Sequence, residues 1–209
     1  MNEAARFERL RAASAPRQAQ AADAGLLGQL FAAAFLHDPV FSWIARTGPE
    51  RQAALESFFC WMMEARVIPF GEAWIADGAA AAWLPPGAPA SPGGILEQIR
   101  LLPLFLKLCG VARLPRGAAM ADVLEKNHPH VPHFYLAVVG VAPDSQGMGL
   151  GSAILDATLK RVDAAHLPAY LENSNPKNTR LYERAGFVTR ADIAPNGAPP
   201  LLGMWRDAR

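Results

Sequence analysis

Hydrophobic residues follow two different spacings along this chain, and the clearest change between them lies in its second half. Residues 133–141 form a continuous apolar run, which predicts a buried strand. Residues 152–165 place hydrophobic side chains three and four positions apart, which predicts a helix. The segment between them, Gln-Gly-Met-Gly-Leu-Gly-Ser (146–152), holds three glycines in five positions. The pattern therefore predicts a strand, a tight glycine-rich loop and a helix in succession.

The same spacings predict the other elements of the fold. Helices are expected over residues 22–36, 49–67, 95–108 and 178–185, and strands over 73–76, 79–84, 169–172, 187–193 and 201–205. Asp23 is expected to cap the first of these helices, and Pro103 to bend or break the third. Residues 85–92 contain four prolines and predict a loop. Two hairpins and one strand–helix–strand crossover predict an α+β fold with a mixed sheet.

Composition restricts the partners that such a domain can have. A chain of 209 residues with 51% hydrophobic residues can bury a core, and a net charge of +1 gives no electrostatic reason to expect nucleic acid or a membrane as a partner. Cys60 and Cys109 lie in apolar stretches without a CxxC motif, so buried, reduced thiols are expected. The Ala- and Arg-rich start is not typical of a transit peptide, because it contains Glu3 and Glu8. We expect a cytoplasmic protein, either a monomer or a homodimer.

The glycine-rich loop is the strongest indication of function. Glycines let the backbone turn tightly and bring its N–H groups close to a ligand. The first N–H groups of a helix have no partner within the helix, and the helix dipole adds partial positive charge there. The loop therefore predicts an anion site, most simply for phosphate. The alternative is a turn that only lets strand and helix pack closely.

The run from Phe134 to Val188 resembles the acetyl-CoA-binding core of the GNAT superfamily of N-acetyltransferases. The family's cofactor motif (Gln or Arg, two residues, Gly, one residue, Gly or Ala) is matched by Gln146, Gly149 and Gly151. A second family block, an Asn followed four residues later by a Tyr and then Gly-Phe, is matched at positions 178, 182 and 186–187. Within the superfamily, Tyr-Leu-Glu-Asn-Ser at 170–174 most resembles the puromycin N-acetyltransferase-like branch.

The resemblance implies a fold and a division of the chain. The fold is a mixed, largely antiparallel central sheet with helices on both faces. Residues 1–22 are expected to be an N-terminal arm or a weak first strand, and residues 23–209 a single domain. Within that domain, residues 85–130 are expected to be a loop and helix insertion on the acceptor side, and residues 133–189 the acetyl-CoA-binding core.

The resemblance also implies acetyl-CoA as co-substrate, no metal, and direct transfer of the acetyl group to a primary amine of a small molecule. The helix N-terminus would hold the pyrophosphate, and the strand backbone would hold the pantetheine arm, with Gly140 as a bulge that redirects the strand. The residues expected to bind acetyl-CoA are Val139, Val141, Gln146, Gly147, Met148, Gly149, Leu150, Gly151, Ser152, Asn178 and Tyr182.

Two residues are candidates for proton transfer. Glu172 is the candidate base that takes the ammonium proton; alternatively, it caps the turn that follows its strand. Tyr182 matches the family position that faces the thioester sulfur and is the candidate acid; alternatively, it is an ordinary half-buried aromatic residue. Asn178 would hydrogen-bond the cofactor, and its alternative is a helix cap.

The acceptor side is predicted less sharply. Phe35, His37 and Asp38 end the first predicted helix, and with Trp83 they are the candidate acceptor-binding residues; a helix-ending turn is the alternative for His37 and Asp38. Their aromatic character predicts an acceptor with an apolar part. The tract His-Pro-His-Val-Pro-His (128–133) suggests a metal site, but no carboxylate or Cys lies at ligand spacing, so a loop is the preferred interpretation.

Two other functions fit parts of the sequence. Gly147, Gly149 and Ser152, with Glu172 twenty residues further on, match a loose dinucleotide-binding pattern and would suit an oxidoreductase. However, few residues remain in the chain after this pattern, whereas that fold needs several further strand–helix units. A non-catalytic acyl-CoA-binding module on the same fold is the second alternative.

Overall fold

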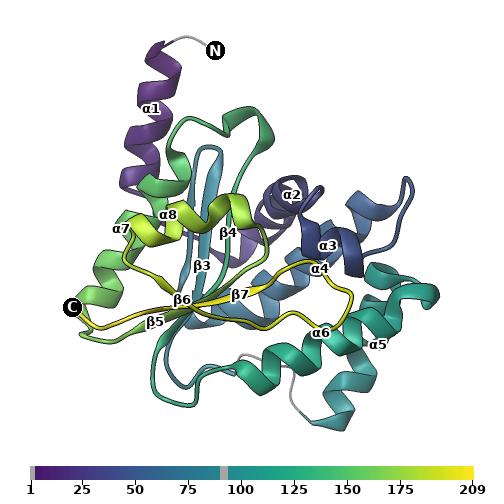
Figure 1. Cartoon of the computed structure of the whole chain (residues 1–209). Helices are drawn as coiled ribbons and strands as arrows, with labels where there is room; N and C mark the ends of the chain where they lie inside the picture. Colours follow the sequence, from purple (N-terminus) through teal and green to yellow (C-terminus); the bar gives the residue numbers. More distant parts are fainter. Residues whose placement is uncertain (1–2, 90–93) are drawn as a thin grey trace.

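A seven-stranded sheet forms the centre of the molecule in the computed structural model, which describes residues 3–89 and 94–209 (Figure 1). The strands are β1 (Arg17–Gln18), β2 (Ala73–Ala76), β3 (Ala79–Leu84), β4 (Phe134–Val141), β5 (Ala169–Asn173), β6 (Val188–Asp192) and β7 (Leu202–Arg206), in the spatial order β1-β2-β3-β4-β5-β7-β6. All neighbours run antiparallel except β4 and β5. The predicted α+β class is confirmed, and a single parallel pair argues against the dinucleotide-binding alternative, which needs a mostly parallel sheet.

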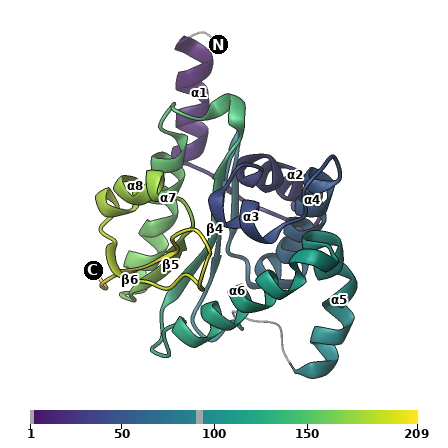
Figure 2. The same cartoon turned by 45° about the vertical axis from the view of Figure 1, so that its right-hand side comes forward.

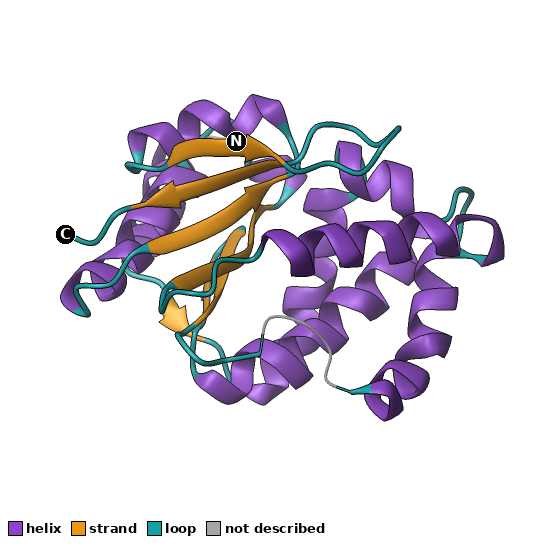
Figure 3. Cartoon of the chain, turned by 60° about the horizontal axis from the view of Figure 1, so that its bottom comes forward, coloured by secondary structure: helices purple, strands orange, loops and turns teal. Residues whose placement is uncertain are grey.

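Helices cover both faces of the sheet, and a further group of helices extends the molecule on one side (Figures 2 and 3). The helices are α1 (Glu3–Ser14), α2 (Ala24–Phe35), α3 (Pro39–Ile44), α4 (Arg51–Met62), α5 (Ile95–Cys109), α6 (Leu114–Asn127), α7 (Leu150–Ala164) and α8 (Thr179–Arg184). α7 and α1 pack together on one face, α2 and α4 on the other, and α5 and α6 lie against α4 and α3. None of the described helices is long and apolar enough to cross a membrane.

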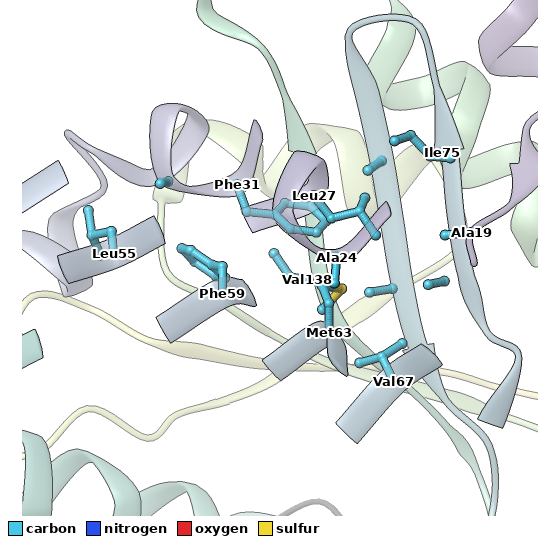
Figure 4. Close-up of a cluster of buried hydrophobic side chains, with 14 of the residues drawn as sticks. Ala19, Ala24, Leu27, Phe31, Leu55, Phe59, Met63, Val67, Ile75 and Val138 are labelled. Atoms are coloured by element: carbon cyan, nitrogen blue, oxygen red, sulfur yellow. The ribbon is translucent and has the colours of Figure 1, made fainter. Parts of the chain in front are cut away.

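Alternating side chains of β3 divide the hydrophobic core in two. Ala79, Ala81 and Trp83 point toward α7, whereas Ala80 and Ala82 point toward α2 and α4. Because alanine side chains are short, the helices approach the sheet closely. Figure 4 shows the half of the core between the sheet and helices α2 and α4, where rings and aliphatic side chains of these helices meet the sheet at Val138 and Ile75.

A bulge in β4 separates it from β5. Ala82 pairs with Val138 and Trp83 with Leu136, so Ala137 is an extra residue that shifts the register. β4 and β5 pair only at Phe134 and Tyr135, just before this bulge. Within the described chain no strand pairs with residues 137–141 on the β5 side, and the two strands open apart toward their C-terminal ends.

The bulge was expected at Gly140, and this position is wrong. Gly140 pairs regularly with Ala80. Its lack of a side chain serves another purpose, because a Cβ there would lie 2.8 Å from the Phe31 ring and 3.2 Å from Ala34. Glycine at this position allows α2 to pack directly on β4.

Residues 3–22 form a helix in addition to a short strand, where an arm or a weak first strand was expected. They form α1, which extends beyond the sheet at the top of Figure 1, followed by the two-residue strand β1 on the edge of the sheet. The hydrophobic pattern did not predict α1, because this helix fully buries only Ala13 and therefore needs no apolar face. Asp23 does not cap α2 with its side chain; its carboxylate instead binds Arg17 at 2.6 Å and accepts from the Gln20 N–H at 2.8 Å.

Two helices on the acceptor side were not predicted separately. α3 is short, and α6 buries only Met120, so neither has a full apolar stripe. Pro103 was expected to bend or break its helix, and it does not break it, because α5 runs from Ile95 to Cys109 with Pro103 inside. The predicted loop 85–92 lies in part outside the described residues, because the structure describes it only as far as residue 89.

Candidate active site

The glycine-rich loop joins the C-terminal end of β4 to α7, as predicted. Gly147 and Gly149 have φ angles of +77° and +91°, which other residues rarely adopt. Gly149 is the N-cap of α7, so the first N–H groups of this helix point out of the loop. The Gln146 side chain donates to the Val141 carbonyl at 3.2 Å and ties the loop to the end of the strand. The geometry suits a bound phosphate group.

Helix α1 supports this loop through Arg9, which no sequence pattern indicated. Arg9 binds Asp77 in the β2–β3 turn at 3.0 Å and lies 3.8 Å from Asp144. It also donates to Ser145, a fully buried residue directly before Gln146. The guanidinium therefore joins α1, the hairpin turn and the start of the loop.

The gap between β4 and β5 lies next to this loop. Val139 and Val141 are half-buried on its β4 side. On the other side, Asn178 precedes α8 and Tyr182 lies within it. Asn178 is exposed and its side chain makes no capping hydrogen bond to α8, so the cap alternative is not supported. Backbone groups of β4 and the free amide of Asn178 thus face one opening.

Tyr182 is buried where this opening meets the core. Its ring packs edge-on against Phe187 with centroids 6.3 Å apart. Among the described residues no group hydrogen-bonds to its hydroxyl. Burial raises the pKa of the Tyr182 hydroxyl above its ordinary value, and the nearby charge of Asp38 adds to the shift. The phenol therefore stays protonated at neutral pH and can act as a donor.

Glu172 lies on β5 with part of its side chain exposed to the cavity. Its Oε1 atom is buried and has no hydrogen-bond partner within the described chain. Burial raises the pKa of Glu172 from 4.5 to about 7, although the hydroxyls of Tyr135 and Tyr170 act in the opposite direction. The bonds that hold the following turn come from Asn173 and Asn175 instead, which removes support for a capping role.

A cavity of about 290 Å³ opens beside Glu172. Aromatic rings dominate its wall: Phe35, Phe41, Phe58, Phe59, Trp61 and Phe105. Neighbouring centroids in this group lie 5.2 to 6.4 Å apart. Glu172, Ser174, Asn178 and Tyr182 line the same cavity, so the proton-transfer candidates and the aromatic wall share one space.

Of the four candidate acceptor residues, the structure brings Phe35 to the cavity but not the other three. His37 is exposed and does not line it. Asp38 is buried and does not line the cavity, but it accepts hydrogen bonds from two residues that do, the Ser174 hydroxyl at 2.7 Å and the Phe41 N–H at 3.0 Å. Trp83 points toward α7 and does not line the cavity, so the structure does not support its assignment to the acceptor site.

The histidine tract forms a loop next to the cavity. The His128 ring lies tilted against His133 with centroids 4.9 Å apart and packs edge-on against Tyr135 at 5.0 Å. Burial lowers the pKa of His128 to about 4, and His133 and His130 add to the shift. Among the residues that the structure describes, no group of three or more His, Cys, Asp or Glu could hold a metal ion.

Both cysteines are free, and only Cys109 lines the cavity. Burial raises the pKa of each thiol above its ordinary value. Neither is therefore a thiolate at neutral pH, the form that an acyl-enzyme intermediate would require.

A family model supports the same region. Residues 107–187, from the last residues of α5 to just beyond α8, match the Acetyltransferase (GNAT) family. This range contains the glycine-rich loop, Glu172 and Tyr182.

Relatives extend the similarity to most of the chain. An uncharacterized N-acetyltransferase of Schizosaccharomyces pombe is 30% identical over 188 residues, which cover 83% of this chain and 75% of that protein. The mycothiol acetyltransferase of Geodermatophilus obscurus is 42% identical over 76 residues, but these cover only 34% of this chain and 21% of that enzyme. A crystal structure from Corynebacterium glutamicum, described as histone acetyltransferase HPA2 and related acetyltransferase, is 24% identical with a TM-score of 0.68 and covers 93% of this chain and 96% of its own.

Proposed function

Because the chain belongs to the GNAT family of acetyltransferases, we propose that it moves an acetyl group from acetyl-CoA directly to a primary amine of a small molecule with an apolar part. One observation carries this proposal: a carboxylate with a raised pKa lies in an aromatic cavity that opens at the gap between β4 and β5. The puromycin N-acetyltransferase-like branch remains our closest assignment within the family, on the run at 170–174.

Acetyl-CoA fits the groups that surround the gap. The first N–H groups of α7 would bind the pyrophosphate, and the unpaired edge of β4 at Val139 and Val141 would bind the amides of the pantetheine arm as a neighbouring strand would. Asn178 offers a free amide on the opposite side. These contacts would bring the thioester next to Tyr182.

Two side chains would move the protons. Glu172 takes a proton from the ammonium group of the acceptor, which frees the lone pair for attack on the thioester carbonyl. Tyr182 donates a proton to the departing thiolate. The raised pKa of Glu172 lets it accept a proton near pH 7, and burial keeps Tyr182 protonated until the thiolate departs. The two thiols take no part.

The acceptor class can be tested with a matched pair of amines. Heptylamine and 1,6-diaminohexane have the same length, but the diamine places a second ammonium group against the aromatic wall, where desolvation of a charge is costly. We expect kcat/KM for heptylamine to exceed that for the diamine by at least about tenfold, measured by CoA release. A preference for the diamine would contradict an apolar acceptor.

Replacement of Glu172 by glutamine should change the pH dependence of turnover. Wild-type kcat is expected to rise with pH through about 7 as Glu172 ionises. Glu172→Gln should lose the most rate near neutral pH and progressively less as the pH rises, because free amine then becomes available without a base. Rate measurements from pH 6 to 10 check this, and a deficit that grows with pH would contradict the role of Glu172.

The same variant offers an independent readout in its stability. The pKa of Glu172 is higher in the folded protein than its ordinary value of 4.5, so the folded state binds the proton more tightly. Ionisation therefore lowers the free energy of unfolding between about pH 4.5 and 7. Glu172→Gln is expected to melt at a higher temperature than wild type at pH 8 and at the same temperature at pH 4.

A further inference from the structure

Asp38 makes two different hydrogen bonds from a buried position. The residue is only 6% exposed and lies at the N-terminus of α3. The Oδ1 atom accepts from the Phe41 N–H at 3.0 Å and caps that helix. The Oδ2 atom accepts from the Ser174 hydroxyl at 2.7 Å. Helix capping therefore accounts for one carboxylate oxygen and leaves the other to be explained.

Ser174 occupies a fixed position in the wall of the cavity. It follows Glu172 by two residues, directly after the end of β5. The turn around it is held by Asn173, whose amide donates to Thr179 Oγ1 at 3.0 Å and whose Oδ1 accepts from the Asn175 N–H at 3.1 Å. Ser174 thus has little freedom to turn away from the cavity.

The hydroxyl of Ser174 has one O–H bond, and it donates this bond to Asp38 as a hydrogen bond. Its oxygen keeps two lone pairs, so any group it meets in the cavity must be a donor. Ser174 lines the same cavity as Glu172 and Tyr182, which places it near the predicted point of acetyl transfer. A primary ammonium group is a donor with three N–H bonds, of which Glu172 requires one.

We propose that Ser174 Oγ accepts a hydrogen bond from an N–H group of the acceptor amine, and that Asp38 is a positioning residue that fixes the Ser174 hydroxyl for this contact. The inference rests on the proposed function. With one N–H directed to Glu172 and another to Ser174, the amine is held at two points on one side of the cavity. Once Glu172 has taken its proton, the neutral amine stays hydrogen-bonded to Ser174 and turns its freed lone pair from Glu172 toward the thioester carbonyl.

The test uses heptylamine binding to the full chain saturated with CoA, measured by calorimetry, together with KM for heptylamine and for acetyl-CoA. Ser174→Ala should weaken heptylamine binding and raise its KM by about tenfold, because a hydrogen bond to a charged group is lost. The KM for acetyl-CoA should change less than about twofold. Ser174→Thr, which keeps the hydroxyl, should restore most of the affinity.

Asp38→Ser separates positioning from capping, since serine is a good N-cap but is too short to bridge to Ser174. We expect it to keep the melting temperature close to wild type and to weaken the amine as Ser174→Ala does. The double variant should be no weaker than Ser174→Ala alone, because Asp38 acts through that residue. Additive losses, or unchanged amine affinity in Ser174→Ala, would overturn the inference. A wild type that binds heptylamine through Ser174 yet acetylates no amine would instead overturn the proposed function alone.

Discussion

Replacement of Tyr182 by phenylalanine is expected to lower kcat by roughly 10²- to 10⁴-fold while acetyl-CoA affinity changes little. The change removes one hydroxyl and keeps the ring, which packs against Phe187. If the phenol protonates the departing thiolate, its loss affects only the transition state and leaves ground-state binding intact. Steady-state kinetics and calorimetry with acetyl-CoA give the two halves of this result.

Packing must be shown to survive the change for this result to be interpreted. The Tyr182 hydroxyl has no hydrogen-bond partner among the described residues, so Tyr182→Phe should melt within a few degrees of wild type. A variant as fast as wild type, under conditions where chemistry limits the rate, would remove Tyr182 from the role of acid. Water would then have to protonate the thiolate.

Gly149→Asp is expected to abolish acetyl-CoA binding. Gly149 caps α7 with a φ of +91°, and a carboxylate there would occupy the position of the phosphate and repel it. Gly149→Asn is the matched control, because asparagine has the same size, tolerates a positive φ better than most residues and carries no charge.

We expect the asparagine variant to bind acetyl-CoA more weakly than wild type but measurably by calorimetry, with both variants folded. Equal binding by the two variants would show that no phosphate approaches this loop. Wild-type affinity in Gly149→Asp would count against the whole assignment of the cofactor site.

Much of the cofactor side could be predicted from the sequence, since its features are local. The strand, the glycine-rich loop and α7 are continuous in the chain, and their residues have strong conformational preferences. Glu172 and Tyr182 likewise follow from short motifs on β5 and α8. A motif of this kind carries its own geometry.

The acceptor side depends on contacts between distant residues, which no local pattern reveals. Asp38 and Ser174 are 136 positions apart and meet only because α3 packs near the end of β5. The face that Trp83 presents depends on the register of β3 beside a bulge in β4. The aromatic wall combines side chains from four helices, and α4, which supplies three of the six rings, was given no role in the site.

The support of the glycine-rich loop by α1 is a further case. Arg9 belongs to an Ala- and Arg-rich segment without an apolar face, so its sequence predicts neither a helix nor a partner. The residues that it binds, Asp77 and Ser145, come from two separate turns. Only the assembled fold shows why an arginine lies there.

The central claim is that this site acetylates an amine rather than only binding an acyl-CoA. Its most direct test is incubation of the protein with acetyl-CoA and heptylamine, followed by mass spectrometry of the amine and measurement of released CoA. We expect N-acetylheptylamine in a one-to-one ratio with CoA, formed at a rate that Tyr182→Phe strongly reduces. Saturable acetyl-CoA binding without any acetylated product, across monoamines and diamines alike, would contradict it and identify a non-catalytic acyl-CoA-binding module.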